Sequence, residues 1–206
     1  MQVEAVDERD VTWESHASRY RLFVYDGPDS AVTAYDITEA TMADVREAAT
    51  QLSHDDARMW SLALVIYHAG ARGLQWLSGM DVHDTPRGAA EWRARREMED
   101  RYLAARARSG AAPLLPDGRR VIRLFAGWAS SPLWETFTDA HVLQPEDLDL
   151  SAELAADLMR WNDAFGARSE IDPEPEGWRA RGWELAARLQ SELDGVAEVR
   201  PEFGDP

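Results

Sequence analysis

Apolar residues are densest in residues 60–79, where they alternate with smaller or polar residues in two short runs separated by glycines. The side chains that share one face of these extended runs are Trp60, Leu62, Leu64 and Ile66 in the first and Leu74, Trp76 and Ser78 in the second. A period of two is typical of strands, although periodicity in so short a run leaves a helix as the alternative. The pattern therefore predicts a buried β-hairpin that marks the core.

The rest of the first 84 residues fits the same sheet. Residues 19–25 and 31–37 are further apolar runs on either side of a turn-rich DGPDS segment, which predicts a second hairpin. Between the two hairpins, Thr41 and Asp44 have the spacing of a capping box. Apolar residues then recur at helical intervals: Met42, Val45, Ala49 and Leu52. We expect a four-stranded antiparallel sheet with one helix on a face.

A long charged helix is expected after this sheet. Thr85 is placed to cap it, Pro86 stands at its first position, and the helical pattern runs to about residue 109. Because it contains few apolar residues, we interpret it as a solvated helix that bridges two halves of the molecule. The alternative is a basic face that meets an anionic group, with three arginines among its members: Arg93, Arg101 and Arg108.

The last third of the chain is predicted to be mainly helical. Residues 121–125 have the composition of a strand, and an irregular acidic connection follows. Ser151 is placed to cap a helix whose large apolar residues form a seam at spacings of four, four, three and four: Leu150, Leu154, Leu158, Trp161 and Phe165. A polar linker precedes a last helix over residues 177–193, and residues 197–203 are expected to close as an edge strand.

Together these elements indicate an α+β fold: an N-terminal antiparallel sheet with one helix, a long charged connecting helix and a helical C-terminal part. We expect three regions along the chain. Residues 1–84 form the ββαββ-like sheet region, and residues 85–126 form the charged helix and a connecting strand. Residues 127–206 form a mainly helical acidic region that packs on the core of the first region or on an adjoining one.

The composition excludes several kinds of chemistry. There is no Cys, so disulfides, thiol nucleophiles and thiolate metal sites are ruled out. All 22 basic residues are Arg, which rules out Schiff bases, a lysine general base and the Lys of a P-loop. Signatures of serine hydrolases, dinucleotide-binding loops, HExxH metalloproteases and EF-hands are also absent. We therefore expect no cofactor and no bound metal.

The charge is large and unevenly placed. The net charge of −16 divides into −7 for residues 1–80, +3 for residues 81–126 and −12 for residues 127–206. Such a chain is repelled by nucleic-acid phosphates and anionic membranes and attracted to basic surfaces, although solubility alone also explains the charge. The N-terminus is acidic, unlike a secretory signal, and no apolar run is long enough to span a membrane. We expect a cytoplasmic protein with a basic protein partner and no direct contact with nucleic acid or membrane.

Two sets of residues are candidates for function. Asp81, His83 and Asp84 form a short cluster after the central hairpin, where a carboxylate beside an imidazole could orient it as a base or hold a metal. The structural alternative is a strand end that leads into the next helix. Trp134 and a group of carboxylates near the second helix start are candidates for binding a basic partner: Glu135, Glu146, Asp147 and Asp149. Their structural alternatives are a Trp that covers the core and acids that favour a helix N-terminus.

Four segments within about residues 128–200 carry a resemblance to a known group: SPLWE, PEDLDLS, ELAADLMRWND and GWRARGWELAARLQSEL. They resemble the C-terminal portion of small acidic proteins of high-GC bacteria, a group with no established activity. There an SPLW segment leads to a PEDLPLS-like helix start, an L-x-x-W-N/D helix and a W-x-x-x-G-x-x-L-A-x-x-L helix. Asp149 stands where that pattern has Pro. The resemblance marks a family and implies no particular chemistry, and the departure at Asp149 bears on where the helix starts.

These observations favour a non-catalytic acidic module that binds a protein. In its sharpest form it is an immunity or antitoxin-like protein that neutralises a basic toxin. One alternative is a small hydrolase-type enzyme that uses Asp81 and His83 with further residues brought in by the fold. The other is a structural subunit or adaptor of a larger assembly. The sequence does not determine the oligomeric state.

Overall fold

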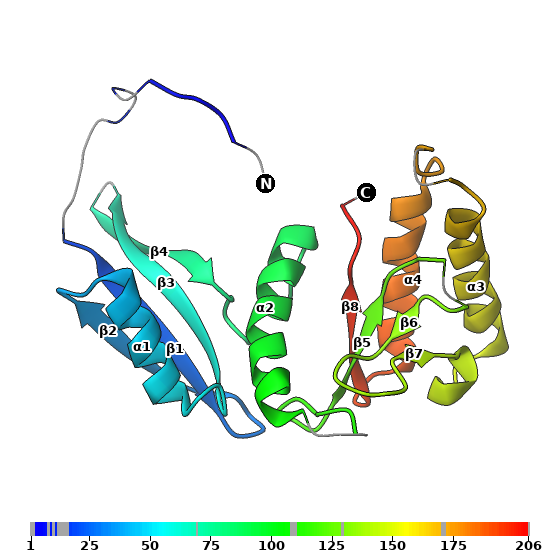
Figure 1. Ribbon diagram of the computed structural model, residues 1–206, viewed down its shortest axis with the longest axis horizontal. Helices are drawn as coiled ribbons and strands as arrows, with labels where there is room; N and C mark the ends of the chain where they lie inside the picture. Colours follow the sequence, from blue (N-terminus) through cyan, green and yellow to red (C-terminus); the bar gives the residue numbers. More distant parts are fainter. Residues whose placement is uncertain are drawn as a thin grey trace.

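Two four-stranded sheets lie on either side of a long helix (Figure 1). The computed structural model describes residues 3–205 except 8, 10, 12–16, 69, 108–110, 129, 170 and 171. Across Figure 1 the first sheet, with α1 drawn over it, is followed by α2, the second sheet, and then α4 and α3. The fold is α+β with an N-terminal antiparallel sheet, a connecting helix and a helical C-terminal part, as predicted.

The first sheet has the strand order β2-β1-β3-β4, and all its neighbours are antiparallel. Its strands are β1 (Arg19–Asp26), β2 (Ala31–Thr38), β3 (Met59–His68) and β4 (Ala71–Ser78). Both predicted hairpins are therefore present. The expected burial of the central hairpin is right for β3, which lies inside the sheet, and wrong for β4, which is an edge strand and mostly exposed.

The helix α1 (Met42–Ser53) covers one face of this sheet and begins as predicted. The Thr41 hydroxyl accepts the Asp44 N–H, and the Asp44 carboxylate accepts the Thr41 N–H at 2.8 Å, which completes the capping box. The buried residues Val45 and Ala49 then pack against alternate residues of β1 and β3: Leu22, Val24 and Leu62.

The helix α2 (Ala89–Arg106) differs from the prediction in its start and its environment. Thr85 and Pro86 precede it; its N-cap is Gly88, and the Asp205 carboxylate accepts the Ala89 N–H at 2.7 Å. The expectation of a solvated helix is wrong, because five of its residues are buried: Arg95, Met98, Glu99, Tyr102 and Leu103. Since two of these are charged, the buried face does not stand out as an apolar stripe in the sequence.

The second sheet has the order β7-β6-β5-β8. Its strands are β5 (Arg120–Leu124), β6 (Leu133–Trp134), β7 (Val142–Leu143) and β8 (Ala197–Pro201). The expected edge strand at the end of the chain is present as β8, which pairs in parallel with β5. The connection predicted to be irregular contains β6, β7 and the short 3-10 helix η1 (Pro145–Leu148). These elements are too short to produce a periodic pattern.

Helices α3 (Ala152–Gly166) and α4 (Trp178–Glu192) cover the outer face of the second sheet. Ser151 caps α3 as predicted, since its hydroxyl accepts the Leu154 N–H. The predicted apolar seam packs against α4 and the sheet. Trp161 and Trp178 stack with ring centroids 4.4 Å apart, and each indole N–H donates to the backbone carbonyl of the other residue.

The two halves meet at α2. Apolar residues of the first sheet, of α2, of the connection after α2 and of the second sheet form one buried cluster: Tyr25, Met59, Met98, Tyr102, Leu103, Leu115 and Val121. Outside it, each half has a cluster of its own, around α1 and around α3 with α4. The division of the chain at residues 84 and 126 remains a prediction. No helix in the part of the chain described above has the length and apolar character needed to cross a membrane.

Candidate functional site

The segment that carries the β7 edge of the second sheet is rich in carboxylates and contains no Arg. Residues 124–159 contain seven Asp or Glu and no Arg or Lys. Asp139 is exposed in the loop between β6 and β7, and Glu146, Asp147 and Asp149 are exposed in η1 or just after it. We call these four residues the acidic edge. It contains three of the predicted partner-binding residues.

The backbone around η1 holds these carboxylates in place. Pro145 is the first residue of η1, and the Asp147 carboxylate accepts the Gln144 N–H at 2.7 Å, so the short helix is capped at its start. Asp149 ends it in the left-handed conformation, with φ of 51°. The acids are therefore presented by a turn of defined geometry rather than by a long loop.

The other two predicted partner-binding residues make contacts within the fold. Trp134 is half-buried between Phe125 and His141, with ring centroids at 4.8 Å and 5.7 Å. Glu135 is buried, and both of its oxygens accept from Arg120 at 2.8 Å. The hydrogen bond to Glu135 raises the pKa of the Arg120 guanidinium, and the Asp147 charge adds to this effect. The Glu135 carboxylate thus already has a cationic partner.

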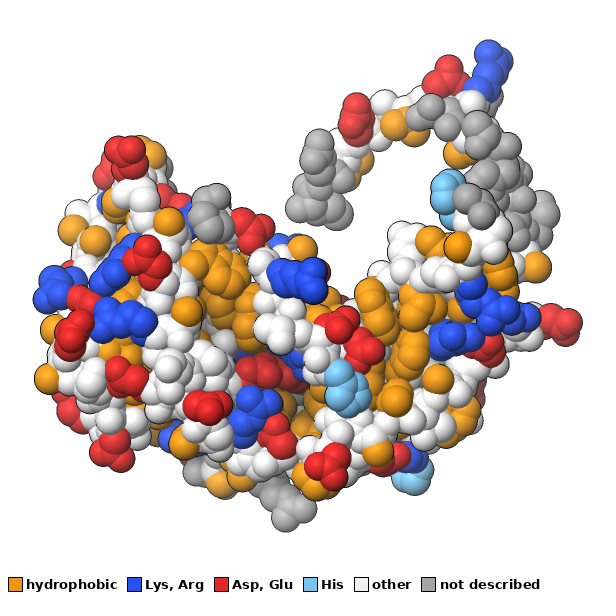
Figure 2. All heavy atoms as spheres, turned by 180° about the vertical axis from the view of Figure 1, so that it is seen from behind, with side chains coloured by type: hydrophobic (Ala, Val, Ile, Leu, Met, Phe, Trp, Pro, Cys, Tyr) orange, Lys and Arg blue, Asp and Glu red, His pale blue; other side chains and the backbone are white. Residues whose placement is uncertain are grey.

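Acids on the α3–α4 face are neutralised by the arginines of the two helices. The Asp157 carboxylate forms ion pairs with Arg181 at 2.9 Å and with Arg188 at 2.5 Å, and it also pairs with Arg160. The hydrogen bond from Arg188 lowers the pKa of the Asp157 carboxyl, and the other two arginines reinforce this. Figure 2 shows basic and acidic side chains side by side on the lobe that these helices form. In the part of the chain that the structure describes, the acidic edge has no comparable set of counter-charges.

The predicted cluster of Asp81, His83 and Asp84 lies in the loop between β4 and α2. Asp81 Oδ1 accepts the His83 N–H at 3.0 Å and lies 3.1 Å from His83 Nδ1, so the carboxylate does orient the imidazole. The Asp84 backbone carbonyl accepts from Arg95 at 2.5 Å. Within the described residues, no group of three or more His, Asp or Glu is placed to hold a metal ion.

His83 also lines a cavity of about 190 Å³ at the junction of the two halves. The segments that surround it come from the turn between β1 and β2, from β3, from the loop before α2, from α2 itself, from the connection to β5 and from β8. Besides His83, its charged lining includes Arg95, Glu99, Asp117, Arg119 and Glu198. We call it the central cavity. In Figure 2, charged side chains of both signs gather between the two lobes.

A buried ion cluster joins α2 to β8 beside this cavity. Arg200 is fully buried, and its guanidinium lies 2.8 Å from Glu99 and 2.8 Å from Asp100. Glu198 is 3.7 Å away. Burial, together with the charge of Glu198, raises the pKa of the Glu99 carboxyl well above its ordinary value. Although burial opposes it, the charges of Glu99, Asp100 and Glu198 raise the pKa of Arg200.

Sequence reasoning missed this cluster, although two signals were present. Glu198 and Arg200 stand two residues apart in a strand and therefore on one face, and Arg95 and Glu99 have the i, i+4 spacing of a helical ion pair. Both signals are ordinarily typical of exposed positions. Their burial depends on the packing of α2 against β8.

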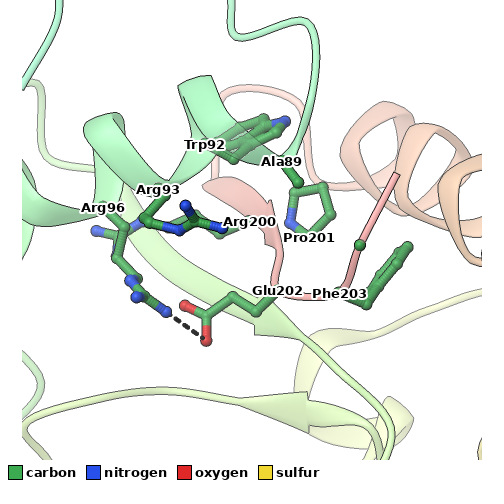
Figure 3. A pocket seen from close by; sticks show the side chains of 9 residues that line it. Ala89, Trp92, Arg93, Arg96, Arg200, Pro201, Glu202 and Phe203 are labelled. Carbon is green, nitrogen blue, oxygen red and sulfur yellow. Dashed lines mark ion pairs between the residues drawn. The ribbon is translucent and has the colours of Figure 1, made fainter. Parts of the chain in front are cut away.

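A second hollow, of about 260 Å³, lies at the N-terminal end of α2 (Figure 3). Trp92, Arg93 and Arg96 reach it from the helix, and the C-terminal segment forms the opposite side. Arg96 pairs with Glu202 at 3.4 Å, and Glu202 also accepts from Arg123 at 2.6 Å. The hollow is thus partly closed by ion pairs between α2 and the second sheet.

The alternative of a basic face on α2 finds little support. Arg101 donates to Ser78 Oγ at 2.9 Å and to the Trp60 carbonyl at 3.0 Å, and burial lowers the pKa of its guanidinium. Arg108 lies outside the described residues. Of the three arginines proposed for that face, Arg93 is exposed.

Comparison with known proteins relates about two fifths of the chain to a family. A family model described as "Serratia CdiI immunity protein-like" matches residues 120–200. The match begins at the first residue of β5 and includes all of β8 except its last residue, so it covers the second sheet with α3 and α4. No curated protein and no solved structure matches the chain. Residues 120–200 are therefore similar to an immunity protein family.

Proposed function

We propose that this protein is an immunity protein that binds and neutralises a protein toxin. The single observation that carries the proposal is the family match over residues 120–200. These residues correspond to a coherent structural unit, because the second sheet, α3 and α4 enclose one apolar core. A match that follows the limits of a packed unit is stronger support than a match to scattered motifs.

The acidic edge is the surface that this proposal assigns to the toxin, and a basic toxin is the partner that fits it. The matched residues contain 8 Arg and 16 acids, a net charge of −8. The α3–α4 acids are largely paired with arginines, whereas Asp139 and Glu146 are exposed and make no side-chain ion pair or hydrogen bond within the described structure. Unpaired carboxylates of one sign speed the encounter with a basic protein and favour it over other partners.

A titration against candidate toxins encoded beside the protein tests the proposal. We expect one of them to bind with a Kd tighter than about 1 μM by isothermal titration calorimetry. Binding is expected to weaken at about 0.5 M salt, where the Debye length falls to a few Å. If none binds tighter than about micromolar, the proposal fails.

Charge reversal locates the binding surface. The double variant Asp139→Arg with Glu146→Arg is expected to weaken binding at least about tenfold, mainly through a slower association rate. The matched control is Asp163→Arg with Glu176→Arg, which makes the same charge change at exposed positions in α3 and in the turn before α4. Equal losses in both variants would show that net charge, and not the acidic edge, governs binding.

A second candidate function is a hydrolase-type reaction at the central cavity. The observation that favours it is the Asp81–His83 contact at 3.1 Å with His83 on the cavity wall, where Ser30 also lies. The expected result is hydrolysis of a panel of small esters that disappears in His83→Ala. Toxin binding unchanged by His83→Ala, with no hydrolysis by the wild type, would eliminate this candidate.

A further inference from the structure

Trp128 is the most exposed aromatic residue in the part of the chain that the structure describes. It lies in the connection between β5 and β6 and is 61% exposed, whereas the other described tryptophans are buried or half-buried. Tyr67, in the first sheet, follows it at 55%. Single exposed apolar residues are common on protein surfaces, so a function for Trp128 requires support from its surroundings.

The backbone on each side of Trp128 is attached to the fold. On one side the Gly127 N–H donates to Oδ1 of the buried Asn162 in α3 at 3.1 Å. On the other side, Ser130 Oγ accepts from Gln144 Nε2 at 3.1 Å. Trp128 is therefore held in a defined position, and binding through it does not require a long loop to become ordered.

The core beneath Trp128 is packed without it. The indole rests against Phe165 of α3, with ring centroids 5.6 Å apart. Phe165 has two further partners, because its ring centroid lies 5.2 Å from that of Trp178 and 4.1 Å from the Arg168 guanidinium. We therefore expect Trp128→Ala to keep the wild-type midpoint of urea unfolding, as substitutions at exposed positions usually do.

The surroundings of Trp128 are acidic. Gln144, which bonds to Ser130, precedes η1, and its N–H donates to the Asp147 carboxylate at 2.7 Å. Trp128 therefore adjoins the η1 end of the acidic edge, where Glu146 and Asp147 are exposed. Carboxylates beside an exposed indole suit a cationic partner, since the negative charge attracts it and the face of the ring binds it.

Elsewhere the protein covers aromatic rings with its own arginines. The Arg101 guanidinium lies 3.8 Å from the ring centroid of Trp60, and that of Arg106 lies 3.7 Å from the ring centroid of Tyr102. Within the described residues, no arginine lies over the ring of Trp128. Its indole face is thus open to a cation from another protein.

We propose that Trp128 is the aromatic anchor of the surface that binds the toxin, and that an arginine side chain of the toxin stacks on its indole. A guanidinium group is planar and weakly hydrated, which suits it to an aromatic face. Glu146 and Asp147 steer the basic toxin to this point, and the indole supplies the close contact. The assignment rests on the proposed function, because the partner is the toxin. It adds to the acidic edge a residue that governs dissociation rather than encounter.

Surface plasmon resonance tests the proposal with the full chain and the neighbouring toxin that binds it most tightly. Trp128→Ala is expected to weaken binding at least about thirtyfold, mainly through faster dissociation. Trp128→Phe keeps an aromatic face and should retain part of the affinity. Trp128→Leu keeps an apolar side chain without a ring and should lose as much as Trp128→Ala. The matched control Tyr67→Ala, which removes an exposed aromatic side chain from the first sheet, is expected to leave the affinity unchanged.

Acrylamide quenching of tryptophan fluorescence reports the contact itself. The free wild type should show an accessible component that Trp128→Phe lacks, because Trp128 is 61% exposed. Saturation with the toxin should remove this component, once the signal of the toxin alone is subtracted.

The proposal is overturned if Trp128→Ala or Trp128→Leu binds the toxin with wild-type affinity, or if Tyr67→Ala loses as much as Trp128→Ala. An accessible component that persists in the complex also overturns it. These outcomes leave the immunity function in place, since the wild type still binds the toxin. Failure of the wild type to bind any neighbouring toxin instead refutes the proposed function and the anchor together. Should Trp128→Ala fail to fold, Trp128→Gln takes its place under the same criteria.

Discussion

Replacing Arg200 by Met tests whether the buried ion cluster between α2 and β8 stabilises the fold. Arg200 is the cation nearest to Glu99 and Asp100, at 2.8 Å from each, and its side chain is 1% exposed. Met keeps an unbranched apolar side chain at the site and removes the charge. In the variant the nearest remaining arginines are Arg95, 3.8 Å from Glu99, and Arg119, 3.9 Å from Glu198. We therefore expect the folded variant to hold a proton that the unfolded chain does not hold at neutral pH.

The expected magnitude follows from the ordinary pKa of glutamate. Protonating one carboxyl whose unfolded pKa is about 4.3 costs about 3.7 kcal/mol at pH 7 and about 1.6 kcal/mol at pH 5.5. These values are upper bounds on the loss, because the pKa of Glu99 is already raised in the wild type. The cost at pH 7 lies within the range of about 3–5 kcal/mol that is typical of breaking a buried ion pair. Arg200 lowers the pKa of Glu99 in the wild type, so its removal raises that pKa further. Because the pKa of the carboxyl is higher in the folded chain than in the unfolded chain, the variant retains its stability at low pH and loses it as the pH rises. The loss of unfolding free energy relative to the wild type is therefore larger at pH 7.

Urea unfolding followed by circular dichroism measures the loss of unfolding free energy at pH 7 and at pH 5.5. Both pH values lie above the isoelectric point of about 4.6. The matched control is Arg160→Met, because that side chain is 71% exposed and its partner Asp157 keeps two other arginines. The control is expected to change the free energy of unfolding by less than about 1 kcal/mol at either pH. A loss below about 1 kcal/mol at pH 7 for Arg200→Met, or a loss that does not shrink at pH 5.5, would refute the reasoning.

Two further predictions concern the second sheet and its helices. Gly182→Ala places a Cβ about 2.8 Å from Phe203 and from Trp161, so we expect a loss of about 1–3 kcal/mol and a weaker near-ultraviolet dichroism signal from the stacked Trp161 and Trp178; an unchanged spectrum and midpoint would contradict the close packing. Ser151→Ala removes the cap of α3 and its hydrogen bond to Glu192 at 2.6 Å, so the free energy of unfolding should fall by about 1 kcal/mol, whereas Ser151→Asn should retain most of it.

Much of the fold was predictable because it depends on neighbouring residues. The capping box of Thr41 with Asp44 and the cap at Ser151 use hydrogen bonds within three residues. Hairpin pairing follows from strand period and turn residues, and the α3 seam follows from helical spacing. The start of α2 was not predictable in the same way, because the Asp205 carboxylate at its first turn comes from the far end of the chain.

In the candidate site, too, the features that depend on neighbouring residues were predictable and those that depend on distant residues were not. Exposure of Glu146, Asp147 and Asp149 agrees with their position at a polar turn, whereas Glu135 in the same acidic stretch is buried against Arg120. Both kinds of residue look alike in the sequence, since charge indicates a preference for solvent and not the presence of a partner. Only the pairing of β5 with β6 brings Arg120 to Glu135.

The sequence by itself therefore determined the α+β class, the caps at Thr41 and Ser151, the hairpins, the helical seam and the excess of negative charge toward the C-terminus. The tertiary structure decided the parallel pairing of β5 with β8, the burial of Arg200 among three carboxylates, and the cavity that six separate segments enclose. The reason is physical: local structure follows from hydrogen bonds and periodicity among near neighbours. The environment of a charged side chain, in contrast, depends on which distant elements pack around it and exclude water.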